Sequence, residues 1–139
     1  MKFFVCFCLI CFGCGCSSTV FAEGPPRLAQ PKLLFQQIVK GMPMGEEQEI
    51  RVVTGVLEPG VTTGWHTHRF PLAVYVLEGE LTLEYEGKEP ITLKAGDIAI
   101  EPANTRVVGY NAGTEVTRIL DFYVSAPETP FVDPAPVKP

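Results

Sequence analysis

Cysteine is missing from most of this chain of 139 residues. All five cysteines fall within the first 16 residues, in a segment that also holds a short positive start and an apolar run over residues 3–12. That run is too short to span a bilayer as a stable anchor, and small residues lead from it to Val20-Phe21-Ala22, which resembles a signal-peptidase site. The sequence therefore predicts a signal peptide over residues 1–22 and an exported protein, periplasmic or secreted, without thiols or disulfides.

Lipoprotein processing is the second interpretation of this segment, since Cys14 and Cys16 each follow a glycine. Bacterial lipoprotein sites usually have leucine three residues before the cysteine, and Cys11 and Gly13 stand there instead. Lipidation at Cys14 or Cys16 would anchor the chain to a membrane, whereas the signal-peptidase interpretation predicts no stable anchor. A hydrophobic anchor that stays in the membrane is the third interpretation.

A basic cluster is also missing. The chain has 11 Lys and Arg against 16 Asp and Glu, a net charge of −5, and its basic residues are scattered along the chain without a cluster. Proteins that bind nucleic acids or anionic membranes carry a basic patch or stripe. We therefore expect no nucleic-acid partner.

No segment shows a sustained helical period, and short apolar or β-branched runs alternate with turns rich in glycine and proline. This pattern predicts one all-β domain over residues 33–124, an antiparallel sandwich or barrel of short strands. An extended lead-in over residues 23–32 would precede it, and a proline-rich tail over residues 125–139, extended or disordered, would follow it. The predicted strands are residues 33–40, 49–57, 73–77, 80–86, 91–93, 98–100, 106–110 and 116–124.

Two of these predicted strands differ in the expected solvent exposure of their faces. Residues 73–77 are apolar at every position, so both faces of that strand need a cover, and a second subunit is the simplest one. We therefore expect a homodimer. In residues 80–86 leucine and tyrosine alternate with threonine and glutamate, which predicts one buried face and solvated glutamates without a catalytic role.

The only two histidines, His66 and His68, follow the only tryptophan, Trp65. In an extended backbone residues i and i+2 point to the same side, so both imidazoles would face one space. Neutral imidazole is a common metal ligand, and two such rings could occupy two positions around one ion. The alternative is a pair of solvated or hydrogen-bonded histidines at the end of a strand.

The residues around the histidines resemble those of the cupin superfamily. Gly60, His66, His68 and Gly79 fit its first motif, and Gly96, Pro102 and Asn111 fit its second at the expected separation. The phrase Y-V-L-E-G-E-L-T, residues 75–82, is similar to that of small single-domain cupins. The resemblance implies a jelly-roll barrel that binds a small molecule in its interior.

The metal-binding part of these motifs is incomplete. The resemblance implies a glutamate where Leu72 stands and a histidine where Val107 stands, while Asn104 takes a glycine position. Only His66 and His68 remain of the family's ligands for iron, manganese, nickel or zinc. One substitute third ligand is Glu101, just before Pro102, which could instead be a solvated charge at a strand end. Four residues are expected to line the barrel or its rim: Leu72, Tyr75, Arg106 and Val107.

Three functions are compatible with these residues. The first is an exported module that binds a small molecule in the barrel beside a degenerate metal site of His66 and His68 only. The second is a metal-dependent enzyme of the dioxygenase or isomerase type with a non-standard third ligand. The third is a structural domain that self-associates through residues 73–77.

Overall fold

The structure, a computed structural model, describes residues 28–135. The predicted signal peptide, its cysteines and the last four residues of the predicted tail lie outside the described residues. Residues 28–32 belong to a first unit, Met1–Lys32, and are exposed without regular secondary structure. The second unit, Leu33–Pro139, contains all strands of the described residues.

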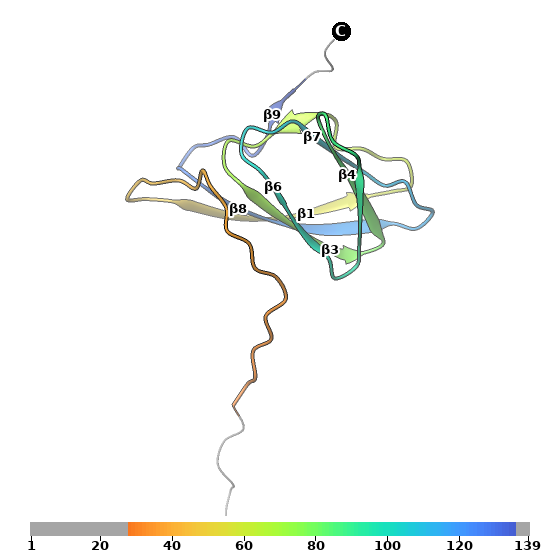
Figure 1. Ribbon diagram of the computed structural model, residues 1–139, viewed down its shortest axis with the longest axis horizontal. Coiled ribbons are helices and arrows are strands. Elements are labelled where there is room, and N and C mark those ends of the chain that lie inside the picture. Colours follow the sequence, from red (N-terminus) through yellow and green to blue (C-terminus); the bar gives the residue numbers. More distant parts are fainter. Residues whose placement is uncertain (1–27, 136–139) are drawn as a thin grey trace, which may run out of the picture. The chain divides into compact units, whose positions relative to one another are not determined.

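The strands form two antiparallel sheets (Figure 1). The first sheet has the order β1-β8-β3-β6 and the second has the order β5-β4-β7-β2-β9. Residues 28–135 contain no helix long and apolar enough to cross a membrane. The predicted all-β jelly roll is therefore confirmed. The strands are β1 (Glu49–Leu57), β2 (His66–Thr67), β3 (Leu72–Glu78), β4 (Glu80–Tyr85), β5 (Ile91–Lys94), β6 (Ile98–Glu101), β7 (Val107–Tyr110), β8 (Thr117–Ser125) and β9 (Asp133–Pro134).

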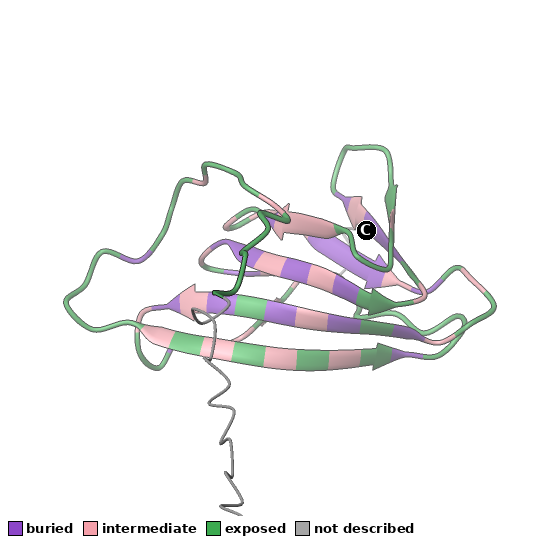
Figure 2. Ribbon diagram, turned by 90° about the horizontal axis from the view of Figure 1, so that it is seen from below, coloured by how far each residue is buried: buried purple, intermediate pink, exposed green. Residues whose placement is uncertain are grey.

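Buried residues alternate with more exposed ones along the strands, which Figure 2 shows as bands of colour. In β8 every second residue from Thr117 to Ser125 is buried, and the residues between them are half-buried or exposed. This is the period of two expected of a strand that packs on one face. The buried apolar core comprises Leu57, Leu72, Val74, Val76, Leu81, Leu83, Tyr85, Val107, Ile119 and Tyr123.

At two positions of the family motifs the residue type is explained by the backbone conformation, which has a positive φ. Gly79, in the turn from β3 to β4, has a φ of 72°, and a Cβ there would overlap the carbonyl oxygen of Val116. Asn104, which takes a glycine position, has a φ of 55°, a conformation that asparagine tolerates better than most residues. Its backbone N–H donates to the carbonyl of His68 at 2.7 Å, so this turn holds the loop after the second histidine.

The prediction of a first strand over residues 33–40 was wrong. The segment forms no ladder, and Leu33, Leu34 and Ile38 are largely exposed. It has the apolar composition of a strand but no neighbouring strand to pair with, and pairing decides whether such a run becomes a strand. At the other end, the described part of the predicted tail contributes to the barrel, because residue 125 completes β8 and β9 pairs with β2.

The outer face of the first sheet carries an apolar row that crosses four strands. Val52 of β1 pairs with Phe122 of β8, which pairs with Ala73 of β3, which pairs with Ile100 of β6. Val52 is 54% exposed and Phe122 46% exposed. Leu77, at the end of the strand expected to be covered on both faces, is 47% exposed. Within this single chain the outer face of β3 therefore lacks part of its cover.

Candidate metal centre

The two histidines face the interior of the barrel from β2 and the residue after it. His66 pairs with Val107 of β7 on one side and with Pro134 of β9 on the other. Both imidazoles are buried, and their ring centroids lie 4.9 Å apart with the planes nearly perpendicular. The predicted shared orientation of His66 and His68 is therefore present. Of the alternative, a solvated pair does not fit, because His68 is only 2% exposed, whereas both rings do form hydrogen bonds.

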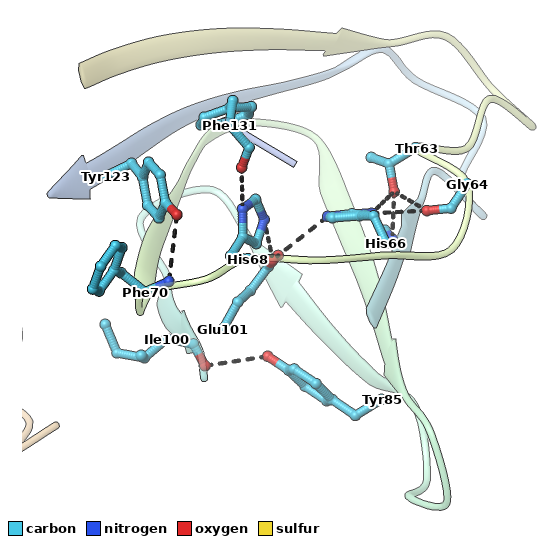
Figure 3. A network of polar contacts seen from close by, with 11 residues as sticks. Thr63, Gly64, His66, His68, Phe70, Tyr85, Ile100, Glu101, Tyr123 and Phe131 are labelled. Atoms are coloured by element: carbon cyan, nitrogen blue, oxygen red, sulfur yellow. Dashed lines mark hydrogen bonds and ion pairs between the residues drawn. The ribbon is translucent and has the colours of Figure 1, made fainter. Parts of the chain in front are cut away.

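Backbone carbonyls fix which nitrogen of each ring carries the proton. His68 Nδ1 lies 2.6 Å from the carbonyl oxygen of Phe131, and His66 Nδ1 lies 2.8 Å from that of Gly64 (Figure 3). A carbonyl oxygen only accepts hydrogen bonds, so both Nδ1 atoms must be the donors. In the neutral rings each Nε2 then keeps its lone pair and is available as a ligand.

Glu101 places a carboxylate opposite these lone pairs. Its Oε2 lies 3.1 Å from His68 Nε2 and 3.8 Å from His66 Nε2. Glu101 is 6% exposed, so the alternative of a solvated strand-end charge was wrong. Among the described residues no donor forms a hydrogen bond with Oε2, since the Nε2 atoms that face it carry no proton in the neutral rings.

The position of Glu101 explains how this chain departs from the cupin motif. Leu72 stands where the first motif has a glutamate, and Leu72 of β3 pairs directly with Glu101 of β6. The carboxylate is thus supplied by the residue of the neighbouring strand β6 that pairs with Leu72. A site with only two protein ligands, as the motif alone suggested, becomes a cluster of His66, His68 and Glu101.

The donor set of this cluster fits a divalent cation. One ligand atom from each of the three residues lies within 4.8 Å of the others. Ligand atoms that each lie about 2.1 Å from one ion are separated by roughly 3 to 4 Å. Two imidazoles and one carboxylate are the donors of non-haem iron sites and of some catalytic zinc sites, which keep positions open for other molecules.

A cavity of about 220 Å³ adjoins the cluster. Most of its wall is hydrocarbon, including Leu72, Leu81, Leu83 and Ile119. Its polar wall residues are the three members of the cluster, Thr63 and Asp121. Cofactor and substrate sites are commonly such mostly apolar spaces with a few convergent polar groups.

Residues 126–135, here called the C-terminal strap, close one side of the cavity with Phe131, Val132 and Pro134. Arg69 forms a two-pronged ion pair with Asp133 of the strap, at 2.7 and 3.0 Å. The strap also supplies the carbonyl that orients His68. No sequence pattern announced this role, because an irregular proline-rich segment lacks the periodicity that identifies a packed element.

The four residues expected to line the barrel lie in different places. Leu72 lines the cavity. Tyr75 does not, because it alternates with the core residues Val74 and Val76 and so lies on the outer face of β3. Val107 is fully buried in the core but does not reach the cavity surface. Arg106 is at the rim, where its guanidinium lies 5.1 Å from the centroid of the Trp65 ring.

Asp121 is a charged cavity residue that the sequence interpretation missed. It is a charged residue at an inward position of β8, between Ile119 and Tyr123, and this alternation was the signal that could have found it. Burial, reinforced by the negative charge of Glu101, raises the pKa of Asp121 to about 7, although the nearby His68 acts in the opposite direction. Burial and the same Glu101 charge also raise the pKa of Tyr85 to about 12.

The antiparallel jelly roll and the buried cluster of two histidines and a carboxylate place this chain in the class of β-barrel proteins with a candidate metal site inside the barrel. Residues 53–123 match the family model described as the cupin domain, and the chain belongs to that family. No curated protein sequence is significantly similar to the chain.

Solved structures with the same fold include enzymes. One is from the work on the DMSP lyases RdDddP and RnDddQII (22% identity, TM-score 0.56, 63% of this chain and 44% of that chain). Another is the polyketide cyclase RemF from Streptomyces resistomycificus (20% identity, TM-score 0.55, 68% of this chain and 65% of that chain). A third is the oxalate decarboxylase of Bacillus subtilis, which has Mn(II) centres (20% identity, TM-score 0.50, 53% of this chain and 21% of that chain). At these identities the similarity shows the fold alone, and the chain spans less than two thirds of each of the three.

Proposed function

We propose that this chain is a metal-dependent cupin enzyme that holds one divalent ion with His66, His68 and Glu101 and acts on a small molecule in the adjoining cavity. One observation carries the proposal: two imidazole lone pairs and a carboxylate oxygen face one another in a buried space. Without a cation or an extra proton between them these atoms are unsatisfied, which is costly in a buried site.

Each protein group has a definite task in this proposal. The carbonyls of Gly64 and Phe131 hold both rings with Nε2 toward Glu101, as outer partners of metal ligands do. The hydrocarbon wall excludes water, which strengthens every electrostatic interaction in the site. A bound iron, manganese, nickel or zinc ion would supply a Lewis acid or a position for dioxygen. Structural similarity to a lyase, a cyclase and a manganese-containing decarboxylase supports an enzyme of this kind.

A binding module without a metal is the second candidate. A specific contact favours it: His68 Nε2 and Glu101 Oε2, at 3.1 Å, are close enough to form an ion pair if the ring gains a second proton. The barrel would then bind its ligand through the ion pair and the hydrocarbon wall. The two candidates differ in whether the buried positive charge is a metal ion or a proton.

Metal content separates the two candidates. We expect elemental analysis of the protein, purified without an affinity tag, to find close to one divalent ion per chain. The variant His66→Ala/His68→Ala should contain none under the same conditions, because two of three ligands are gone. Wild-type protein that stays metal-free after incubation with iron, manganese, nickel and zinc would reject the enzyme proposal in favour of the binding module.

Export and self-association complete the proposed function. Export rests on the predicted signal peptide. The homodimer rests on the apolar row Val52–Phe122–Ala73–Ile100, because rows of this kind on a two-fold related copy can pack face to face. A stable interface needs roughly 800 Å² of surface from each partner, and an apolar sheet face is a suitable source.

A charge placed in the apolar row should therefore separate the subunits. We expect light scattering to give the mass of a dimer for the wild type and of a monomer for Phe122→Glu, because an unpaired carboxylate in an apolar interface is strongly unfavourable. Ile91→Glu changes an exposed isoleucine of β5, on the other sheet, and should leave the dimer intact. A Phe122→Glu variant of unchanged mass would assign the interface elsewhere.

A further inference from the structure

Among the residues that the structure describes, Asp121 is the only charged one of the cavity wall outside the metal cluster. It lies in the middle of β8, flanked by Val53 of β1 and Val74 of β3, and is 9% exposed. Its Oδ1 is buried and accepts no hydrogen bond from any residue between 28 and 135. A buried acceptor without a partner costs free energy, so its presence at a cavity surface points to a partner from outside the chain.

No described residue supplies a basic side chain to balance this carboxyl group. Among residues 28–135, neither a lysine nor an arginine lines the cavity. Arg51 is committed to Ser125 and to the strap carbonyl of Thr129, at 2.9 and 2.7 Å. Arg106 is bound to Glu86 and to the carbonyl of Ala135. Glu101 lies beside the two imidazoles, so Asp121 is the acidic group of the described cavity wall that is available to contact a bound molecule.

We propose that Asp121 is a second anchoring point for the ligand and that the site selects a small molecule that carries, besides its metal-binding group, a hydrogen-bond donor, an ammonium or a hydroxyl group. The inference rests on the proposed function, since the metal ion would hold the metal-binding group of the molecule. The same carboxyl group disfavours a molecule with a second carboxylate in that place. Two carboxylates in a mostly apolar cavity repel each other, and none of the described wall residues is a lysine or arginine that would offset the repulsion.

The charge state of Asp121 decides how strongly it acts. Glu101 and His68 are the groups whose charges act on it most, in opposite directions, after burial itself. Burial and the charge of Glu101 raise the pKa of Asp121, whereas a metal ion bound at the cluster would lower it and favour the ionised carboxylate. An ammonium group then gains a charge-assisted hydrogen bond, which is roughly twice as strong as a neutral one. A hydroxyl group gains the weaker bond.

A matched series of small 2-hydroxy acids tests this selectivity. Isoserine, glycerate and tartronate share an α-hydroxy-carboxylate group that can chelate a metal, and their third carbon carries an ammonium group, carries a hydroxyl group or is itself a second carboxylate. Binding of each to the Co(II)-loaded protein is followed by the visible absorption of Co(II) at about pH 8. We expect isoserine to bind at least about tenfold more tightly than tartronate, with glycerate between them.

Variants then assign the selectivity to Asp121. Asp121→Asn removes the charge but keeps the shape and an acceptor, so it should weaken isoserine binding by about tenfold and change glycerate binding little. Asp97→Asn, an exposed turn residue, is the charge-matched control and should change neither. Circular dichroism would verify that each variant is folded.

Each outcome leads to a separate conclusion. Wild-type protein that binds Co(II) but prefers tartronate, or has no preference, would overturn the inference without any variant. The expected preference in the wild type that persists in a folded Asp121→Asn variant would also overturn it, because another group would be responsible. Protein that binds no Co(II) would overturn the proposed function, and the inference would fall with it.

Discussion

Replacement of Glu101 by glutamine will lower the affinity for a divalent ion on the order of a thousandfold, because losing only the outer partners of metal ligands already costs about 10- to 100-fold. The substitution removes the only anionic donor of the cluster. A glutamine amide also has N–H groups that can donate to the lone pair of His68 Nε2, 3.1 Å from the present carboxylate oxygen. The variant would therefore satisfy the buried groups without a cation, and it should fold.

The affinity is best measured by competition with a chelating fluorescent indicator, on protein first stripped of metal. Glu84→Gln is a suitable control, because it makes the same change on the solvent side of β4 and should leave the affinity unchanged. If Glu101→Gln bound the ion as tightly as the wild type, Glu101 would not be a ligand. A two-histidine site completed by another group would then have to replace the proposed one.

Much of the fold could be predicted from the sequence, because its signals are local. The run from Glu49 to Leu57 is rich in β-branched residues and ends at Pro59-Gly60, and it forms β1 with the predicted bounds. The histidine spacing predicted the shared orientation of the two rings for the same reason. The prediction of a strand over residues 33–40 was wrong because a strand also needs a neighbouring strand to pair with, and no local sequence signal indicates whether one is present.

The carboxylate of the site could only be proposed, because it depends on register between strands. Glu101 is near the histidines because β6 pairs with β3 so that Leu72 faces Glu101. A shift of one residue would turn Glu101 to the outer face, and the sequence alone does not fix that register. Asp121 had a local signal, a charge at an inward position, but the role of the strap depends on long-range contacts from Phe131 and Asp133.

The buried carboxyl of Asp121 should make the metal-free protein less stable as the pH rises. Its pKa is about 7 in the folded protein against an ordinary value of 3.8, so the folded state holds the proton more tightly than the unfolded chain does. The contribution to stability is fully present below pH 3.8 and is lost as the pH rises through about 7. The loss is at most on the order of 4 kcal/mol, at about 1.4 kcal/mol for each unit between the two values.

Urea unfolding in the presence of a chelator, at several pH values between about 4 and 8, measures this loss. Asparagine does not titrate, so the stability of Asp121→Asn should fall less over the same range, and its advantage over the wild type should grow with pH. Parallel curves for the two proteins would show that Asp121 ionises freely in the folded state.

Because the charge of Glu101 is the second cause of the raised pKa of Asp121, Glu101→Gln should also reduce the pH dependence of stability. Glu84→Gln should not, since its charge lies on the solvent side of β4. If Glu101→Gln left the pH dependence unchanged, burial alone would account for the behaviour of Asp121.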